Sequence, residues 1–416
     1  MKLTKEVFTV SLANALIVMG YGLSVPFFAI YLNVQRGIPA SIVGAIVAFA
    51  MLGTSVASGV SGELSDVLGR KKVMVVSLYL RAASMLLMGL AMALGAHYIW
   101  IIICHVLGSF FGAFFRPASN AWIADTVSRK NLMQAFGYIR IGLNIGWASG
   151  PAIGGILAGH SFALPFALTG VAYALTGIFL HFNIKECFVR SKERKAKFTD
   201  MVLELKNPRL FKMCILIFAI ALVSAQLVTG LSLHGINYIK LTQGQIGMLF
   251  SINGLVVVLL QYHMGKIMTG IRVTTALIIG CIIYGIGYIL VGAAHAFTLA
   301  AVGVSLVSIG EMALSPGSNT LISNIAPDKL RGRYLGMQEV SRQIGVACGM
   351  FAAGMMIEHL SPIHQIIPWL LVGAVAFAAA FGFYKIRCMF TPEEDGLNQP
   401  LTPPPPAKND DVQVVS

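Results

Sequence analysis

The sequence has few charged residues, and this scarcity sets its class. Charged side chains are 11% of 416 residues and hydrophobic ones 56%, whereas soluble proteins are about 25% charged. Six cysteines are scattered without a Cys-x-x-Cys pair, a pattern that predicts neither a disulfide framework nor a metal site. Nine histidines form no His-x-x-x-His pair. We therefore expect the protein to bind no metal and no cofactor and to have no enzymatic activity.

What the sequence does have is a succession of long apolar runs. A membrane-spanning helix needs roughly 20 apolar residues, and the chain has room for twelve such runs. The fold class predicted is an all-α polytopic membrane protein with 12 transmembrane helices. The expected spans are 7–32, 41–61, 73–94, 99–124, 134–158, 163–183, 210–232, 244–264, 274–293, 298–324, 334–357 and 367–384.

The excess of basic residues follows the order of the loops. The formal net charge is +13, and 23 of the 30 Lys and Arg fall in the even-numbered loops and the two termini. The odd-numbered loops hold only Arg36 and Lys240. Because basic loops stay in the cytoplasm, we expect both termini there and no nucleic-acid partner.

An internal repeat divides the chain into two halves. A shift of 199 positions superposes the fourth and fifth spans on the tenth and eleventh without a gap, and it pairs Pro117 with Pro316 and Gly150 with Gly349. Such a repeat predicts two pseudo-symmetric six-helix bundles. The expected domains are an N-terminal bundle 1–183, a cytoplasmic basic linker 184–209, a C-terminal bundle 210–390 and a disordered cytoplasmic tail 391–416.

A charged segment joins the second and third spans: Gly62-Glu-Leu-Ser-Asp66-Val-Leu-Gly69-Arg70-Lys-Lys72. Gly62 and Gly69 permit close backbone approach or a positive φ. The segment resembles the loop signature of the major facilitator superfamily, Gly-x-Leu-Ser-Asp-x-x-Gly-Arg-Lys. Its repeat copy, 265–272, lacks the acidic residue, so the role of Asp66 is confined to the first half.

The resemblance implies a conformational latch. In this family's pattern Arg70 pairs with an acid such as Asp125 at the end of the fourth span. Asp66 would cap the start of the eleventh span near Tyr334, where the positive end of the helix dipole favours an anion. The two contacts together would hold the halves closed on the cytoplasmic side, in the outward-open state.

Two interpretations apply to the glycine-rich fifth span. Glycines four residues apart form a groove for a neighbouring helix, and an internal proline kinks the helix. The pattern also resembles the signature of the superfamily's antiporter branches, Gly-x-x-x-Gly-Pro-x-x-Gly-Gly. Its residues here are Gly146, Gly150, Pro151, Gly154 and Gly155.

Glu311 lies in the middle of the tenth span, where an ionised carboxylate is costly. Proton coupling requires a carboxyl group that is neutral when the cavity opens to one side of the membrane and ionised when it opens to the other. The alternative is a Glu311 that stays protonated in a structural hydrogen bond. Glu339 in the eleventh span has Arg342 three residues on, a spacing that permits a local pair. The residue at the corresponding position of the first half is Arg140. An ion pair between Glu339 and Arg140, across the cleft between the two halves, is therefore an equal alternative. These four residues are the proton-coupling candidates.

Polar and aromatic side chains at middle depth face protein or water rather than lipid. They are candidates for the lining of a substrate cavity, with ordinary packing as the alternative for each. Arg81 and Arg116 also need partners within the bundle. The cavity candidates are Asn14, Tyr21, Phe115, Arg116, Asn144, Trp147, Gln226 and Asn253.

The motifs together look most like the bacterial multidrug:proton antiporter branch of the superfamily. One departure is that Cys104 and His105 stand where that branch has an arginine. The resemblance implies a secondary active transporter of the bacterial inner membrane. It would be monomeric, with a small amphipathic substrate and protons as partners, and would export by rocker-switch alternating access. A proton-coupled symporter, or a facilitator of a nutrient, lipid or other metabolite, would share the fold.

Overall fold

A computed structural model describes residues 5–127, 132–186, 203–268, 271–327 and 330–397. Within these ranges the regular structure is entirely helical, and twelve stretches are long and apolar enough to cross a membrane. The predicted fold class is thereby confirmed.

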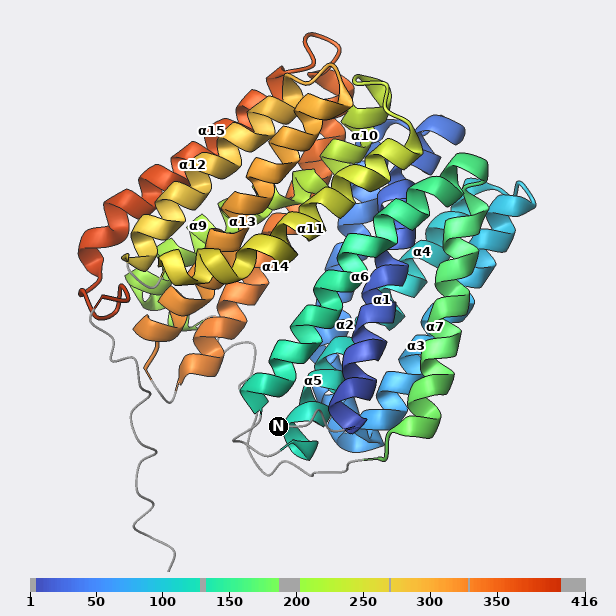
Figure 1. Ribbon diagram of the computed structural model, residues 1–416, viewed down its shortest axis with the longest axis horizontal. Coiled ribbons are helices and arrows are strands. Elements are labelled where there is room, and N and C mark those ends of the chain that lie inside the picture. Colours follow the sequence, from blue (N-terminus) through green and yellow to red (C-terminus); the bar gives the residue numbers. More distant parts are fainter. Residues whose placement is uncertain (1–4, 128–131, 187–202, 269–270, 328–329, 398–416) are drawn as a thin grey trace, which may run out of the picture.

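The first half of the chain forms one bundle, the N-half (Figure 1). Its closest internal packing is between the first and fifth spans and between the third and sixth. The helices are α1 (Lys5–Ile30), which continues as the π-helix η1 (Tyr31–Gln35), α2 (Ala40–Leu68), α3 (Arg70–Ala93), α4 (Tyr98–Gly112), α5 (Phe115–Thr126), α6 (Leu132–His160) and α7 (Ala163–Asn183).

The second half forms a matching bundle, the C-half. The seventh span is broken at 225–228, between α9 and α10, by the short 3₁₀-helix η4 (Ala225–Leu227). The other helices are continuous. The helices are α9 (Pro208–Ser224), α10 (Thr229–Asn237), α11 (Gln243–Met268), α12 (Val273–Gly292), α13 (Phe297–Ile325), α14 (Arg331–His359) and α15 (Ile367–Ile386).

The fourth span, predicted as one helix over 99–124, is in fact two helices, α4 and α5, which separate at Ala113 and Phe114. Pro117 has no N–H to donate to the carbonyl of Ala113, and proline is well placed in the first turn of the new helix α5. Serines of α2 donate to the two carbonyls at the break: Ser61 Oγ to Phe114 O at 2.7 Å and Ser58 Oγ to Ala113 O at 3.4 Å.

The two halves meet chiefly through two helix pairs, α2 with α14 and α6 with α11, and less extensively through α1 with α10. We call the face where α1 begins and α15 ends the termini face. The described hydrogen bonds between the halves start at the opposite face, with Asn237 Nδ2 to Asn33 Oδ1 at 2.9 Å. They reach toward the termini face as far as Ser55 Oγ to Gln343 Oε1, at 2.8 Å. In Figure 1 the two bundles accordingly converge at the top and separate toward the bottom, where α1 begins.

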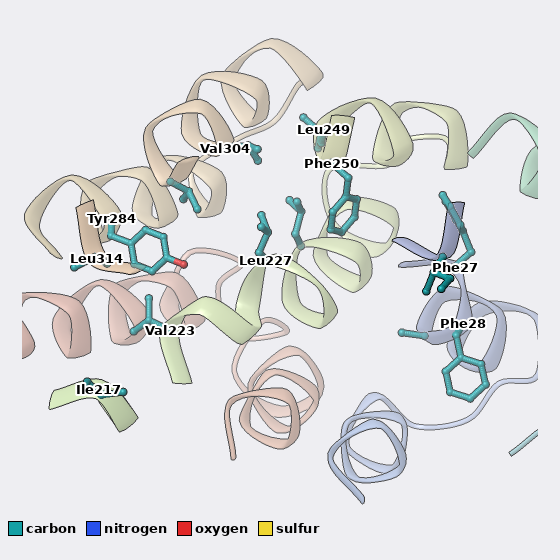
Figure 2. Packing of buried hydrophobic residues seen from close by; sticks show 14 of the residues in the cluster. Phe27, Phe28, Ile217, Val223, Leu227, Leu249, Phe250, Tyr284, Val304 and Leu314 are labelled. Carbon is teal, nitrogen blue, oxygen red and sulfur yellow. The ribbon is translucent and has the colours of Figure 1, made fainter. Parts of the chain in front are cut away.

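The main buried core contains side chains from both halves. Figure 2 shows Phe27 and Phe28 of α1 on one side, and Leu227, Val304 and Leu314 of the C-half on the other. Because the outer faces of the helices are also apolar, many large side chains such as Phe182 are exposed there. Exposed apolar side chains all around the bundle are what a lipid environment requires.

The predicted disordered tail is corrected at its start. The segment 391–397 packs on the C-half, and Asp395 is fully buried. Its carboxylate accepts from Thr274 N at 2.8 Å and from Thr274 Oγ1 at 2.6 Å. The free N–H groups of the first turn of α12 attract this carboxylate, a partner that composition does not reveal. The remaining tail, 398–416, and most of the predicted linker lie outside the described residues.

Candidate functional site

A cavity of about 770 Å³ lies between the halves on the termini side of their contacts. The N-half contributes α2 and α5, and the C-half contributes α9, α12, α13 and α14. Polar and charged side chains are a large part of its wall. They are Thr54, Ser58, Arg116, Asn120, Ser224, Tyr284, Glu311, Ser315, Ser318, Asn319, Gln338, Glu339, Arg342 and Gln343.

A second cavity of about 320 Å³ extends from the first into the N-half. The two share Met51, Thr54, Ser58 and Arg116 in their walls. The second cavity is mainly apolar, with aromatic or methionine side chains from α1, α3, α5 and α7, and its C-half wall consists of Val228, Thr229 and Met350. We call it the N-half pocket.

Glu311 lies in the wall of the larger cavity, as its depth in α13 led us to expect. The amide of Asn253 on α11 faces it, with Nδ2 3.5 Å from Glu311 Oε2 and 2.9 Å from Ser308 Oγ. The same amide accepts from Trp147 Nε1 of α6 through Oδ1, at 3.0 Å. A polar chain therefore runs from Glu311 across the junction between the halves.

Glu339 forms the local pair and not the pair across the cleft. Arg342 Nε donates to its Oε2 at 2.7 Å, and Gln343 Nε2 donates to its Oε1 at 2.9 Å. Arg140, the candidate partner in the N-half, is exposed and does not line the larger cavity. The spacing of three residues on one helix decides this geometry, because neighbouring side chains on one helix face need no movement of the halves to meet.

Half of the predicted cavity residues line a cavity. Asn14, Tyr21, Phe115 and Arg116 lie in the wall of the N-half pocket. Asn144, Trp147, Gln226 and Asn253 are in neither wall, so a role for these four in substrate binding stays a prediction. Gln226 is buried and donates to the Gly349 carbonyl at 2.9 Å, and Trp147 and Asn253 bond each other. Periodicity predicts depth, but not which polar side chain a neighbouring helix will cover.

The latch residues meet within the N-half. Arg70 Nε lies 3.1 Å from Asp125 Oδ2, and Arg70 Nη1 lies 2.5 Å from Asp66 Oδ1. Ser65 Oγ accepts from Arg70 Nη1 at 2.6 Å. Tyr334, the expected neighbour of Asp66, has a partner in its own half, since its hydroxyl accepts from Asn207 Nδ2 at 2.9 Å. The capping of α14 by Asp66 therefore stays a prediction for another state of the molecule.

The predicted loop 62–72 is helical except at one residue. Helix α2 continues through Gly62 to Leu68, and α3 begins at Arg70. Only Gly69 leaves the helix, with φ at +99°, a conformation that strongly favours glycine. Glu186 approaches from beyond α7, and its carboxylate accepts from Lys71 N at 2.9 Å and Lys72 N at 3.0 Å. This carboxylate occupies the space where a Cβ on Gly69 would lie, 2.7 Å from Glu186 Cδ.

The glycines of the fifth span serve helix packing. Gly146, Gly150 and Gly154 face the backbone of α1, where no side chain would fit. Gly155 and Pro151 face α11 of the other half, against Gln243 and Gly247. The motif therefore holds α1 close on one side and forms part of the junction with the C-half on the other. The packing interpretation is confirmed, and the antiporter interpretation remains a prediction.

Two basic side chains that sequence reasoning did not place in the cavity line the N-half pocket, Arg81 and His105. The signal was an arginine within an apolar run, which must find a polar environment inside the bundle. The positions of its neighbours required the fold. The His105 ring is stacked on Phe28, with centroids 3.7 Å apart.

Similarity to known proteins extends over nearly the whole chain. The family model described as Major Facilitator Superfamily matches residues 10–268 and 215–412. An uncharacterized MFS-type transporter of Methanocaldococcus jannaschii is 25% identical over 365 residues, which are 86% of this chain and 93% of that protein. Multidrug resistance protein 2 of Bacillus subtilis is 24% identical over 384 residues, 89% of this chain and 92% of that protein.

The solved structures agree on the fold. The crystal structure of the nucleoside transporter NupG has a TM-score of 0.78 at 13% identity, covering 93% of this chain and 100% of that chain. Twelve apolar helices and relatives of this kind are typical of multi-pass proteins of the bacterial inner membrane. The chain belongs to the major facilitator superfamily and is a multi-pass membrane transporter of small molecules.

Proposed function

We propose that the protein is a proton-driven exporter of small amphipathic molecules. One observation supports this most directly. Of the two acidic residues in the wall of the larger cavity, Glu339 is neutralised by Arg342, whereas Glu311 has no basic partner among the described residues. A carboxyl group that can gain or lose a proton inside a solute cavity is a basis for coupling the two.

The contacts of Glu311 link its charge to the junction of the halves. Asn253 touches Glu311 with its amide nitrogen and Trp147 with its oxygen. Loss of the proton from Glu311 makes its carboxylate a stronger acceptor for this amide. The hydrogen bond from Trp147 holds the amide in its orientation. Proton binding therefore biases the contact between α6 and α11, along which the halves move against each other.

Alternating access then follows from the position of the contacts. The structure is open on the termini face, and the proposal places this face in the cytoplasm, which the distribution of basic residues supports. In the opposite state the cytoplasmic ends would close and bring Asp66 to the start of α14. Arg70 and Asp125 already hold Asp66 in place on the N-half, which leaves this one contact to form.

Export rather than uptake is supported by the resemblance of the glycine–proline motif and by the multidrug resistance protein among the relatives. A proton symporter would share the cavity but move protons in the same direction as its substrate. A facilitator would share the cavity but need no proton movement. The protein acts as a monomer in this proposal, because each monomer contains a complete cavity between its own halves.

The test is proton release from energised inverted vesicles. When dyes with cationic, neutral and anionic members are added outside, each transported dye should release lumenal protons. Glu311→Gln should abolish this release yet retain dye exchange without a gradient, which shows that the variant is folded. Glu6→Gln, an exposed residue at the start of α1, is the control and should behave as the wild type. Unchanged proton release in Glu311→Gln rejects Glu311 as the coupling acid, and proton uptake with the dye indicates symport.

A further inference from the structure

The Asp, Glu, Lys and Arg side chains in the described wall of the N-half pocket are all positively charged. Arg81 and Arg116 lie in its wall, and among the described lining residues there is no Asp or Glu. No carboxylate of the described residues lies within ion-pair distance of either arginine. Arg81 Nε is buried and has no hydrogen-bond acceptor. Burying a charged donor without an acceptor is costly, so Arg81 favours a ligand that brings an acceptor to it.

Aromatic rings hold the Arg81 guanidinium without neutralising it. Its Cζ lies 4.6 Å from the ring centroid of Tyr173 and 6.0 Å from that of Tyr21. Cation–π contacts of this kind fix the orientation of an arginine, and they leave the N–H groups available for an acceptor. Gly112 makes the position possible, because a Cβ there would lie 2.6 Å from Arg81 Nε.

The repeat shows that this cation is a special feature of the N-half. Under the shift of 199 positions, Arg81 corresponds to Gly280 and Gly112 corresponds to Glu311. In the N-half, therefore, a cation on the third span, Arg81, lies next to a glycine on the fourth span, Gly112. The C-half has a glycine on its third span and an acid on its fourth. Arg81 and Glu311 therefore carry opposite charges, and each has a glycine at the corresponding position of the other half.

We propose that the N-half pocket binds the anionic group of an amphipathic organic acid, with Arg81 as its principal partner. The carboxylate accepts hydrogen bonds from the Arg81 guanidinium, and the apolar body lies on the side chains of α1 and α3 that line the pocket, such as Val18, Phe28 and Met85. This names a substrate class and so rests on the proposed transport function. Zwitterions whose amine reaches Glu311 belong to the same class.

Binding to the intact protein in lipid nanodiscs tests this without any proton gradient. The probes are pyrenebutyrate and pyrenebutanol, which share their apolar body and differ in the charged group, with empty nanodiscs subtracted. A charge-assisted hydrogen bond in a buried site predicts that the wild type binds pyrenebutyrate about tenfold more tightly. Arg81→Gln should remove this preference and leave pyrenebutanol binding unchanged, and Arg81→Lys should retain part of it.

Gly112→Ala is a second variant that keeps the charge. It displaces the guanidinium and should reduce the preference while pyrenebutanol still binds. Equal affinity of the wild type for both probes, or a preference that survives Arg81→Gln, overturns the proposal. An equal loss of both probes in Arg81→Gln and Gly112→Ala also overturns it, because Arg81 then only supports packing. Proton release plays no part in this readout, so a failure of proton coupling leaves the result interpretable.

Discussion

At the scale of single residues, small side chains decide how closely the helices approach. Each glycine of the α6 motif that faces α1 lies against a main-chain carbonyl, as Gly150 does against Met19 O. The sequence predicts these contacts because glycines four residues apart share one helix face. It does not predict the partner helix, since any neighbour with a smooth surface would fit the groove.

We expect Gly150→Ala to lower the stability of the folded protein. The added methyl group would overlap the Met19 carbonyl oxygen, and overpacking of this kind costs about 1–3 kcal/mol. Thermal unfolding in detergent is the measurement. Gly137→Ala on the same helix is the matched control, because nothing lies within 4 Å of a Cβ there. Equal stability of the two variants would contradict the close packing of α6 on α1.

At the scale of elements, each half repeats one capping device. The segment after the sixth span returns to the N-terminus of the third span of the same half. In the N-half Glu186 accepts from the first turn of α3, and in the C-half Asp395 accepts from the first turn of α12. The two acids do not correspond under the shift of 199 positions. In both halves the free N–H groups at a helix start require an acceptor. Carboxylates from different positions in the sequence supply it.

The two caps differ in burial, and this predicts different effects of their removal. Asp395 is fully buried, so Asp395→Ala leaves Thr274 N without an acceptor and should cost about 1–3 kcal/mol. Glu186 is exposed, and Glu186→Ala should cost about 0.5–2 kcal/mol, the usual range for a helix cap. Hydrogen exchange at the first turns of α12 and α3 measures each local loss.

The exposed Glu393 is the control for the tail, since Glu393→Ala keeps the Asp395 cap. Exchange at the start of α12 should then match the wild type. If Asp395→Ala leaves that exchange unchanged as well, segment 391–397 does not stabilise the helix.

At the scale of the whole molecule, the described contacts between the halves leave the termini face open. We expect Asp66→Asn to slow transport about two- to fivefold without changing the range of substrates, because an anion at a helix start is worth about 0.3–1 kcal/mol in the state that closes this face. The measurement is initial transport rate for several dyes. A changed substrate range at an unchanged rate would show that Asp66 is not a latch.

The same variant should shift the population of states. Asn33 and Asn237 touch at the face opposite the termini, so cysteines at both positions, in a chain without its native cysteines, should be joined by a short bifunctional thiol reagent in this state. The yield should rise when Asp66→Asn is added and fall when substrate and a proton gradient drive turnover. Each single cysteine variant serves as the control.

The sequence by itself determined the number of spans, their boundaries to within a turn or two, and the division into two halves. These features depend on local properties, namely the length of apolar runs, the placement of charge between them and a repeat in register. It also placed Glu311 at cavity depth and paired Arg70 with Asp125 by resemblance to the family.

Only the tertiary structure decided which polar groups face one another. It covered Gln226 with α14, bonded Trp147 to Asn253, and placed Arg81 in a pocket without an acid. It also bound the start of the tail, through Asp395, to α12. The physical reason is that a polar side chain in the membrane must find an acceptor or donor within the bundle. Residues far apart in the chain supply that partner.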